Sequence, residues 1–142
     1  MLSNEMNYIT LSGKEYPIRC DMLVLEKIQD AFGDVSEFEN KLMGFTPSVD
    51  KNGETKKDAE GRTIGISGIP DIRALKVALY EMIKEGTEVD GTEFKEKPET
   101  LLRAADMTPR ELSIILHGEF MRCFQRKNQG TTQNKEMKKQ SR

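Results

Sequence analysis

The sequence predicts a mainly α fold of the α+β class, in which an N-terminal β-hairpin packs on a bundle of four to five helices. Two short β-prone runs surround a Ser-Gly-Lys turn near the start of the chain. The later segments repeat their apolar residues at the period of a helix. A polar stretch interrupts these segments, so we also expect a disordered internal insertion and a disordered C-terminal tail.

Composition agrees with one small domain. The 142 residues are 36% hydrophobic and 32% charged, whereas globular domains average roughly 45–50% and 25%. The net charge of −2 provides no general attraction to nucleic acid or anionic membranes. No apolar run reaches the roughly 18 residues of a membrane helix, and the first residues do not resemble a signal peptide. We therefore expect a cytoplasmic protein.

The hairpin is predicted from residues 8–11 and 15–20. Gly13 between them supplies the positive φ that a tight turn requires. Pro17 has no amide hydrogen, so the second run should be an edge strand or should pair on its other side only. A lone hairpin is marginal in water, so this one should pack on a helix.

Two helices should follow. Asp21 is a good N-cap for the first, and Gly33 is a good C-cap. Its apolar face is predicted from Met22, Leu25, Ile28 (or Gln29) and Phe32. In the second helix, Ser36 and Glu39 have the spacing of a capping box, Phe38 and Leu42 form the apolar pair, and Gly44 follows the end.

Residues 46–68 are predicted to be a flexible insertion. Residues 48–62 hold one valine and one alanine as their only aliphatic side chains, too few to offset the entropy cost of ordering. Asn52-Gly53 and Glu60-Gly61 are turn candidates, and residues 63–66 could form a brief strand.

A third helix should begin at Pro70, where a missing amide costs nothing, and end at Gly86. Its apolar face is predicted from Ile72, Leu75, Leu79 and Ile83 (or Met82). A short helix is expected from Pro98. Residues 87–97 between them are polar, and we expect a loop there, or at most a poor hairpin.

The last helix has the clearest start. Thr108 and Glu111 form a capping box around Pro109 at the first helical position. We expect the helix to run to Lys127, with Gly118 allowing a close helix crossing. Its core face is predicted from Leu112, Ile115, Leu116, Phe120 and Cys123. Residues 1–127 are then a single helical domain, and residues 128–142 are a disordered basic tail.

No catalytic, cofactor-binding or metal-binding signature is present in the sequence. The single histidine, His117, has Ser113 one turn before it and no acidic or cysteine partner nearby in sequence. We interpret it as a partly exposed helix residue. Catalytic, cofactor and metal sites are all predicted to be absent, and we expect a protein that is not an enzyme.

Cys20 and Cys123 stand far apart at apolar-patterned positions. Buried reduced thiols are favoured over a disulfide in a cytoplasmic protein.

The last helix carries more apolar surface than one helix seam uses. Such a helix is either central in the core or partly a partner site. Methionines are common on adaptable binding surfaces, although filling gaps in the core is the commoner role. Ile114, Met121 and Phe124 are the candidate partner-binding residues.

Four segments resemble the small tail assembly chaperones of long-tailed (siphovirus-type) bacteriophages and prophages of Firmicutes. They are ITLSGKEYPIRCD (9–21), LEKIQDAFG (25–33), PDIRALKVALYEMI (70–83) and MTPREL (107–112). The similarity covers residues 7–45 and 69–126, whereas the insertion matches no motif of that family.

The resemblance implies a chaperone that binds the phage tape measure protein and keeps it soluble while the tail tube polymerises. The tail tube subunit and a second copy of the chain are further expected contacts, with neither membrane nor nucleic acid. The protein would be absent from the mature virion. A frameshifted, extended form is typical of that family. The alternatives are a structural virion or connector protein of a phage tail and a small nucleic-acid-binding regulator.

Overall fold

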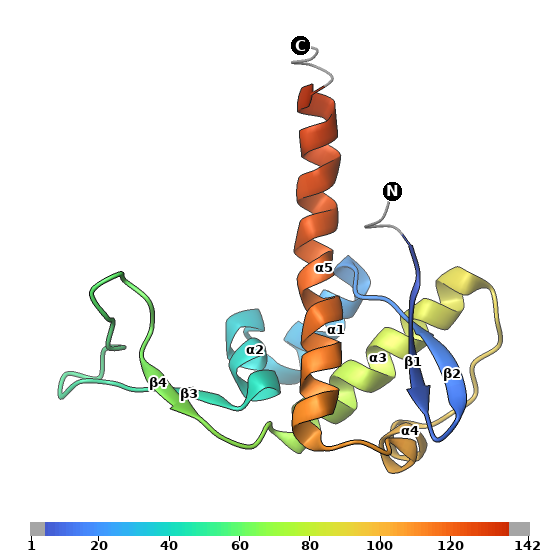
Figure 1. The fold of residues 1–142 in the computed structure, drawn as a ribbon, viewed down its shortest axis with the longest axis horizontal. Coiled ribbons are helices and arrows are strands. Elements are labelled where there is room, and N and C mark those ends of the chain that lie inside the picture. Colours follow the sequence, from blue (N-terminus) through green and yellow to red (C-terminus); the bar gives the residue numbers. More distant parts are fainter. Residues whose placement is uncertain (1–4, 137–142) are drawn as a thin grey trace.

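The computed structural model describes residues 5–136, which form an α+β fold with an N-terminal β-hairpin and five helices (Figure 1). In chain order the elements are β1 (Asn7–Leu11), β2 (Lys14–Ile18), α1 (Met22–Phe32), α2 (Val35–Met43), β3 (Phe45–Pro47), β4 (Gly65–Ser67), α3 (Ile72–Asp90), α4 (Pro98–Ala104) and α5 (Pro109–Glu136). The predicted fold class is confirmed. None of the described helices is long and apolar enough to cross a membrane.

The N-terminal hairpin forms around a two-residue turn. Ser12 and Gly13 have φ values of 49° and 82°, the pair of positive angles that matches the twist of the flanking strands. Ile9 lies opposite Tyr16 in the antiparallel register. The inward side chains of both strands are buried: Ile9, Leu11, Tyr16 and Ile18. The hairpin thus contributes one wall of the core, as expected for a two-stranded sheet that packs on helices.

Helix α3 crosses this hairpin closely, and here one expectation is wrong. Gly86 does not end the helix, because α3 continues to Asp90 and Gly91 caps it with φ 79°. A Cβ atom on Gly86 would lie 2.5 Å from the carbonyl oxygen of Pro17. The glycine is therefore required by the approach of β2. The amide of Arg19 also donates to the carbonyl of Met82 at 3.0 Å.

Helices α1 and α2 have the predicted lengths but differ in detail. Asp21 caps α1 by accepting from the amide of Val24. Val24 and Ile28 form its buried face, whereas the predicted Met22 is 68% exposed. Asp34, rather than Ser36, caps α2, because its carboxylate accepts from the Ser36 amide at 2.9 Å.

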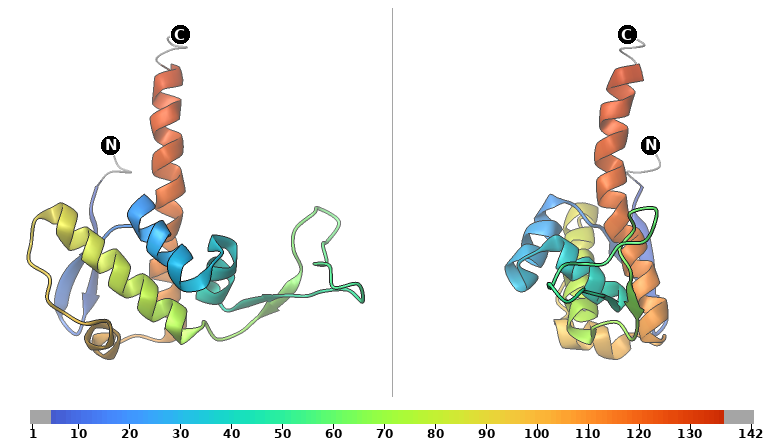
Figure 2. Two further views of the ribbon diagram at one scale, coloured as in Figure 1. Left: turned by 180° about the vertical axis from the view of Figure 1, so that it is seen from behind. Right: turned by 90° about the vertical axis from the view of Figure 1, so that its left-hand side faces the viewer.

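The core lies where α3 passes among the other helices and the hairpin (Figure 2). Its buried side chains form one cluster to which each of α1 to α5, β1 and β2 contributes. In α2 these are the predicted pair, Phe38 and Leu42. The two strands of the inserted segment, β3 and β4, contribute none of these residues, which already separates that segment from the body.

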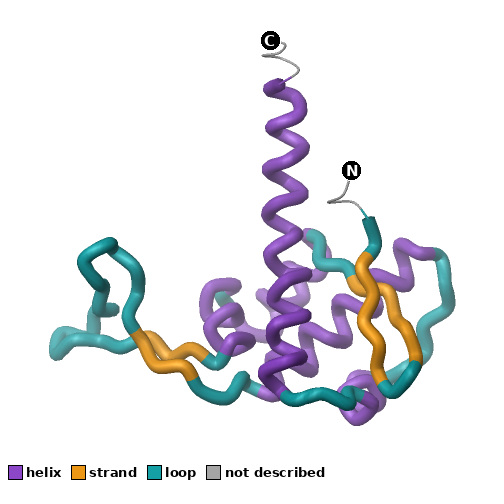
Figure 3. The backbone as a smooth tube through the Cα atoms, viewed as in Figure 1, coloured by secondary structure: helices purple, strands orange, loops and turns teal. Residues whose placement is uncertain are grey.

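Residues 44–68, hereafter the β-arm, project from the helical body (Figures 2 and 3). Strands β3 and β4 pair antiparallel, with Thr46 opposite Ile66. Isolated bridges join Val49 to Thr55 and Lys57 to Thr63. The expectation of a segment without regular structure is therefore wrong, although the brief strand expected at residues 63–66 is close to β4. Its flexibility stays a prediction.

The outer part of the β-arm contains two copies of one turn. Asp50 accepts the amides of Asn52 and Glu54 on one carboxylate oxygen, and Asp58 accepts the amides of Glu60 and Arg62 in the same way. Each turn contains a glycine with positive φ, Gly53 and Gly61. The turns were predicted in position, but their repeat of eight residues was not recognised.

Helix α5 extends further than expected. It runs to Glu136 rather than ending at Lys127, and its C-terminal part stands clear of the body (Figure 1). Helix propagation requires only backbone bonds once a helix is nucleated, so the polar sequence does not stop it. The predicted disordered tail, residues 128–142, overlaps this helix up to Glu136. Residues 137–142 lie outside the described part of the chain.

Candidate functional site on helix α5

The start of α5 is fixed by its capping box. The Thr108 amide donates to Oε1 of Glu111 at 3.0 Å, and the Glu111 amide donates to Oγ1 of Thr108 at 3.1 Å. These reciprocal bonds satisfy two amides that have no partner inside the helix. The predicted cap is confirmed, and it sets which face of α5 meets the core.

Arg110 joins this helix start to the base of the β-arm. Its Nη1 donates to the Met43 carbonyl at 2.8 Å, and its Nη2 donates to the Gly68 carbonyl at 2.7 Å. One guanidinium therefore holds the chain as it enters and as it leaves the arm. At the same place the Gly68 amide donates to the Gly44 carbonyl at 2.7 Å. A Cβ on Gly44 would collide with the Gly68 carbonyl.

The buried stripe of α5 consists of Leu112, Leu116 and Phe120, together with the polar Ser113 and Glu119. Phe120 packs its ring against Phe38 of α2, with the centroids 5.6 Å apart. The Ser113 hydroxyl donates back to the Arg110 carbonyl at 2.8 Å. This stripe matches the predicted core face, except that Ile115 is 39% exposed.

Glu119 is the buried charge that holds α5 against the start of the chain. Its Oε1 accepts from Nδ2 of Asn7 at 2.9 Å and from Nη1 of Arg122 at 3.0 Å, and its Oε2 accepts from the Cys20 amide at 3.2 Å. Arg122 also donates to the Glu5 carbonyl at 2.6 Å. A buried carboxylate is costly unless it is paired and hydrogen-bonded, and here both conditions are met.

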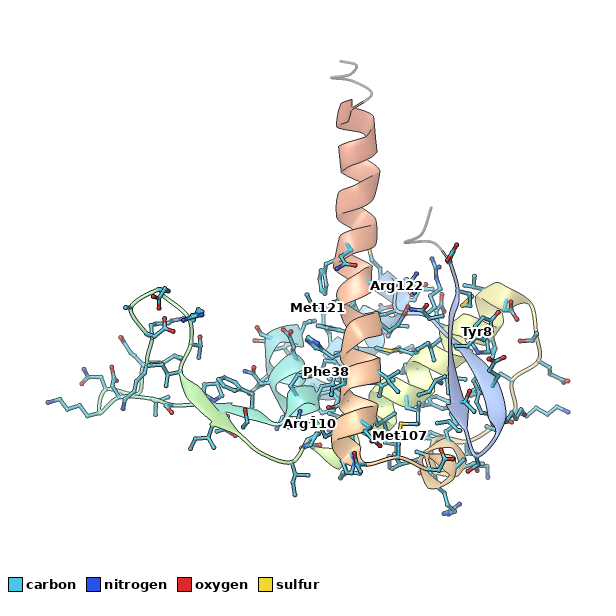
Figure 4. The ribbon with its side chains drawn as sticks, viewed as in Figure 1. Tyr8, Phe38, Met107, Arg110, Met121 and Arg122 are labelled. Atoms are coloured by element: carbon cyan, nitrogen blue, oxygen red, sulfur yellow. The ribbon has the colours of Figure 1, made fainter. Side chains whose placement is uncertain are left out.

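The three predicted partner-binding residues all reach the surface. Ile114 is 57% exposed, Met121 37% and Phe124 38%. Ile114 and Met121 are seven positions apart, two helical turns, and therefore share a face; Figure 4 marks Met121 on α5. Between them Gly118 has nothing within 4 Å of a Cβ position. The expected close helix crossing at Gly118 is thus wrong among the described residues.

Phe124 differs from the other two. Its ring meets the ring of Phe120 edge-on at 5.4 Å, and Phe120 is core. Such an aromatic pair contributes about 0.5–1.5 kcal/mol beyond burial. Phe124 therefore belongs partly to the core, whereas Ile114 and Met121 do not. We call Ile114, Ile115 and Met121 the α5 apolar face.

His117 has a partner that the sequence did not suggest. Its Nε2 lies 2.8 Å from Oε2 of Glu39 on α2. Both side chains line a hollow of about 600 Å³ beside the arm base, together with Asn40, Met43, Phe45, Ser67 and Arg110. The described residues contain no group of three or more potential metal-binding side chains.

Sequence reasoning missed Arg110, Glu119 and Arg122 as organising residues. Glu119 carried a usable signal, because it is an acidic residue inside the apolar stripe that Leu116 and Phe120 define. Arg110 carried none, since its two carbonyl partners come from the far ends of the β-arm.

Comparisons with known proteins provide no family for this chain. No protein-family model, no curated protein and no solved structure matches it.

Proposed function

We propose that this protein is a non-enzymatic tail assembly chaperone of a long-tailed phage or prophage, which binds the tape measure protein and keeps it soluble while the tail tube assembles. It acts in the bacterial cytoplasm and leaves before the virion is complete. The resemblance of residues 9–33, 70–83 and 107–112 to that family suggests this role.

The observation that carries the proposal is the α5 apolar face. Ile114, Ile115 and Met121 are exposed on a helix whose buried side is fully used by the core. Exposed apolar residues grouped on a rigid element are typical of protein-binding sites. A tape measure protein is long and helical, and an apolar helix face suits a partner helix that presents residues at i, i+3, i+4 and i+7.

Rigidity adds to this argument. The capping box, the Arg110 bonds and the Glu119 network hold α5 by both ends of its packed part. A binding face on a fixed helix loses little conformational entropy when a partner docks. The face can therefore bind without first being ordered.

The test is co-expression with the tape measure protein of the same phage. The double variant Ile114→Gln, Met121→Gln removes apolar surface at two exposed sites. Glutamine is a good helix former, so α5 should stay intact. We expect captured soluble tape measure protein to fall about tenfold, with a change in unfolding free energy below about 0.5 kcal/mol.

The matched control is Met22→Gln with Leu23→Gln, because these residues of α1 are 68% and 60% exposed. This control should capture the partner as the unaltered chain does. If both double variants lost capture of the partner equally, or if neither lost it, the assignment of the α5 apolar face would be contradicted. Phe124→Ser belongs in the same series, and it should lower stability as well, since its ring packs on Phe120.

Mass spectrometry of purified virions tests the role itself. A chaperone should be missing from finished particles. Stoichiometric presence there would overturn the proposal in favour of a structural virion or connector protein. For the nucleic-acid regulator, the corresponding sign is DNA binding that weakens steeply as salt rises.

A further inference from the structure

The fold brings the two cysteines of the chain together. Cys20 stands between the hairpin and α1 and is fully buried, and Cys123 lies on α5 and is half-buried. Cys123 packs against the buried cluster that contains Cys20, and its thiol is the largest influence on the pKa of the Cys20 thiol. From sequence they were two unrelated apolar positions. In the structure they bring the junction between the hairpin and α1 next to the last helix, α5.

The polar network around Glu119 fixes this meeting. The Cys20 amide donates to Oε2 of Glu119 at 3.2 Å, and Glu119 precedes Cys123 by one turn on the same face of α5. Asn7 and Arg122 hold the Glu119 carboxylate from the other side. Hydrogen bonds through Glu119 therefore hold the backbone of Cys20 beside the turn of α5 that carries Cys123.

We propose that Cys20 and Cys123 are a reversible disulfide site, which under oxidising conditions locks α5 to the junction between the hairpin and α1. The oxidant is a small-molecule disulfide. The Cys123 thiolate attacks one of its sulfur atoms, and the other half leaves as a thiolate that takes up the Cys123 proton. Cys20 then attacks the Cys123 sulfur and displaces the second half, which takes up the Cys20 proton.

The exchange is balanced. Two protein thiols are oxidised to one disulfide, and the external disulfide is reduced to two thiols. Thiolates, rather than thiols, carry out such attacks, so the environment assigns the order of the steps. The neighbouring Cys123 thiol, burial and the negative charge of Glu119 raise the pKa of Cys20 far above its ordinary value. Cys123 is the more exposed, attacking residue, and Cys20 resolves the mixed disulfide.

The experiment treats the purified full chain with oxidised glutathione and follows its intact mass. The unaltered chain should become a monomer lighter by two hydrogen atoms, with a single cross-link between the peptides that contain Cys20 and Cys123. Its melting temperature should rise by up to about 10 °C, because the bond closes a loop spanning most of the domain. Reduction should reverse both changes.

Two variants keep the test decisive. Cys123→Ser should gain no glutathione adduct and no cross-link, because the attacking thiol is gone. Cys20→Ala should accumulate a stable mixed disulfide at Cys123, and this chemical readout survives even if the buried substitution lowers stability. A lasting adduct on the unaltered chain, a disulfide-linked dimer in place of the internal bond, or an unmodified Cys123 in Cys20→Ala would each overturn the proposal.

Discussion

The N-terminal hairpin and the base of the β-arm are both antiparallel two-stranded sheets, but they depend on different forces. The hairpin buries Ile9, Leu11 and Ile18 against the helices. The arm leaves Ile64 41% exposed and Ile66 69% exposed. Since a two-stranded sheet alone is marginal in water, the hairpin gains its stability from the core.

The β-arm is held in another way. Its base is closed by the Gly44–Gly68 backbone contact and by Arg110, and its outer turns are set by the carboxylates of Asp50 and Asp58. Such polar bonds each contribute roughly 0.5–1.5 kcal/mol net. The comparison indicates that strand pairing specifies local shape in both regions, whereas burial alone makes one of them part of the folding unit.

The largest expected effect comes from truncating one isoleucine in each region. Ile18→Ala removes a side chain that is 2% exposed and should lower the unfolding free energy by about 3 kcal/mol. Ile66→Ala, at 69% exposure, should change it by less than about 0.5 kcal/mol. Urea denaturation measures both. Similar losses at the two sites would mean that the arm unfolds together with the core.

An intermediate effect is expected where the hairpin meets α3. Gly86→Ala places a Cβ 2.5 Å from the Pro17 carbonyl oxygen, and overpacking of this kind costs about 1–3 kcal/mol. Gly118→Ala is the matched control, because it is also inside a helix but has open space around it. The control should gain about 0.5–1 kcal/mol from helix propensity. Equal gains at both positions would disprove the close crossing.

The smallest expected effect is a pH dependence of stability that should arise at the hairpin and not at the base of the β-arm. At the exit of the hairpin, a hydrogen bond with Asp21 and partial burial raise the pKa of Glu85 to about 7. Burial raises the pKa of Asp21, but hydrogen bonds with Glu85, Arg19 and the Val24 amide outweigh it, and the net direction is down. The arm base instead relies on bonds from Arg110 to the backbone carbonyls of Met43 and Gly68.

The sign follows from proton binding. Between pH 4.5, the ordinary pKa of Glu85, and about pH 7, its raised value, the folded state holds a proton that the unfolded state has lost. Stability therefore falls as pH rises through this window. Because Glu85 is partly exposed, we expect a loss of about 1 kcal/mol. Thermal melts of Glu85→Gln should show this slope removed, and an unchanged slope would refute the role of Glu85.

Local signals predicted most of the helical body. Asp21, Gly33 and the Thr108–Glu111 capping box act over a few residues, so their chemistry can be read from neighbours in sequence. The exposure of Ile114, Met121 and Phe124 agrees with their selection as candidates, although partner binding itself stays a prediction. The stripe of α5 was also found, because its period is local.

The rest depends on contacts between distant residues. Gly86 looks like the glycine that ends a helix. A glycine is needed there because β2 passes close to α3, and a single sequence does not reveal that contact. Arg110, Glu119 and the Cys20–Cys123 pair likewise take their roles from partners far along the chain. The regular structure of the β-arm was missed because the prediction was based on the low hydrophobic content of the segment. Its turns are instead ordered by hydrogen bonds to aspartate side chains.

Backbone hydrogen bonds in the outer β-arm leave no strand edge there that could pair with a strand of another molecule. Ser48 donates its amide to the Ile64 carbonyl, Ile64 donates to Lys56, and Lys56 donates to Ser48, at 2.8 to 3.0 Å. The three chain segments thus form a closed ring in which every one of these amides and carbonyls is occupied. An open sheet edge is a template for aggregation. At this level the described part of the arm has no such open edge, so it offers no free strand there for pairing with another copy of the protein.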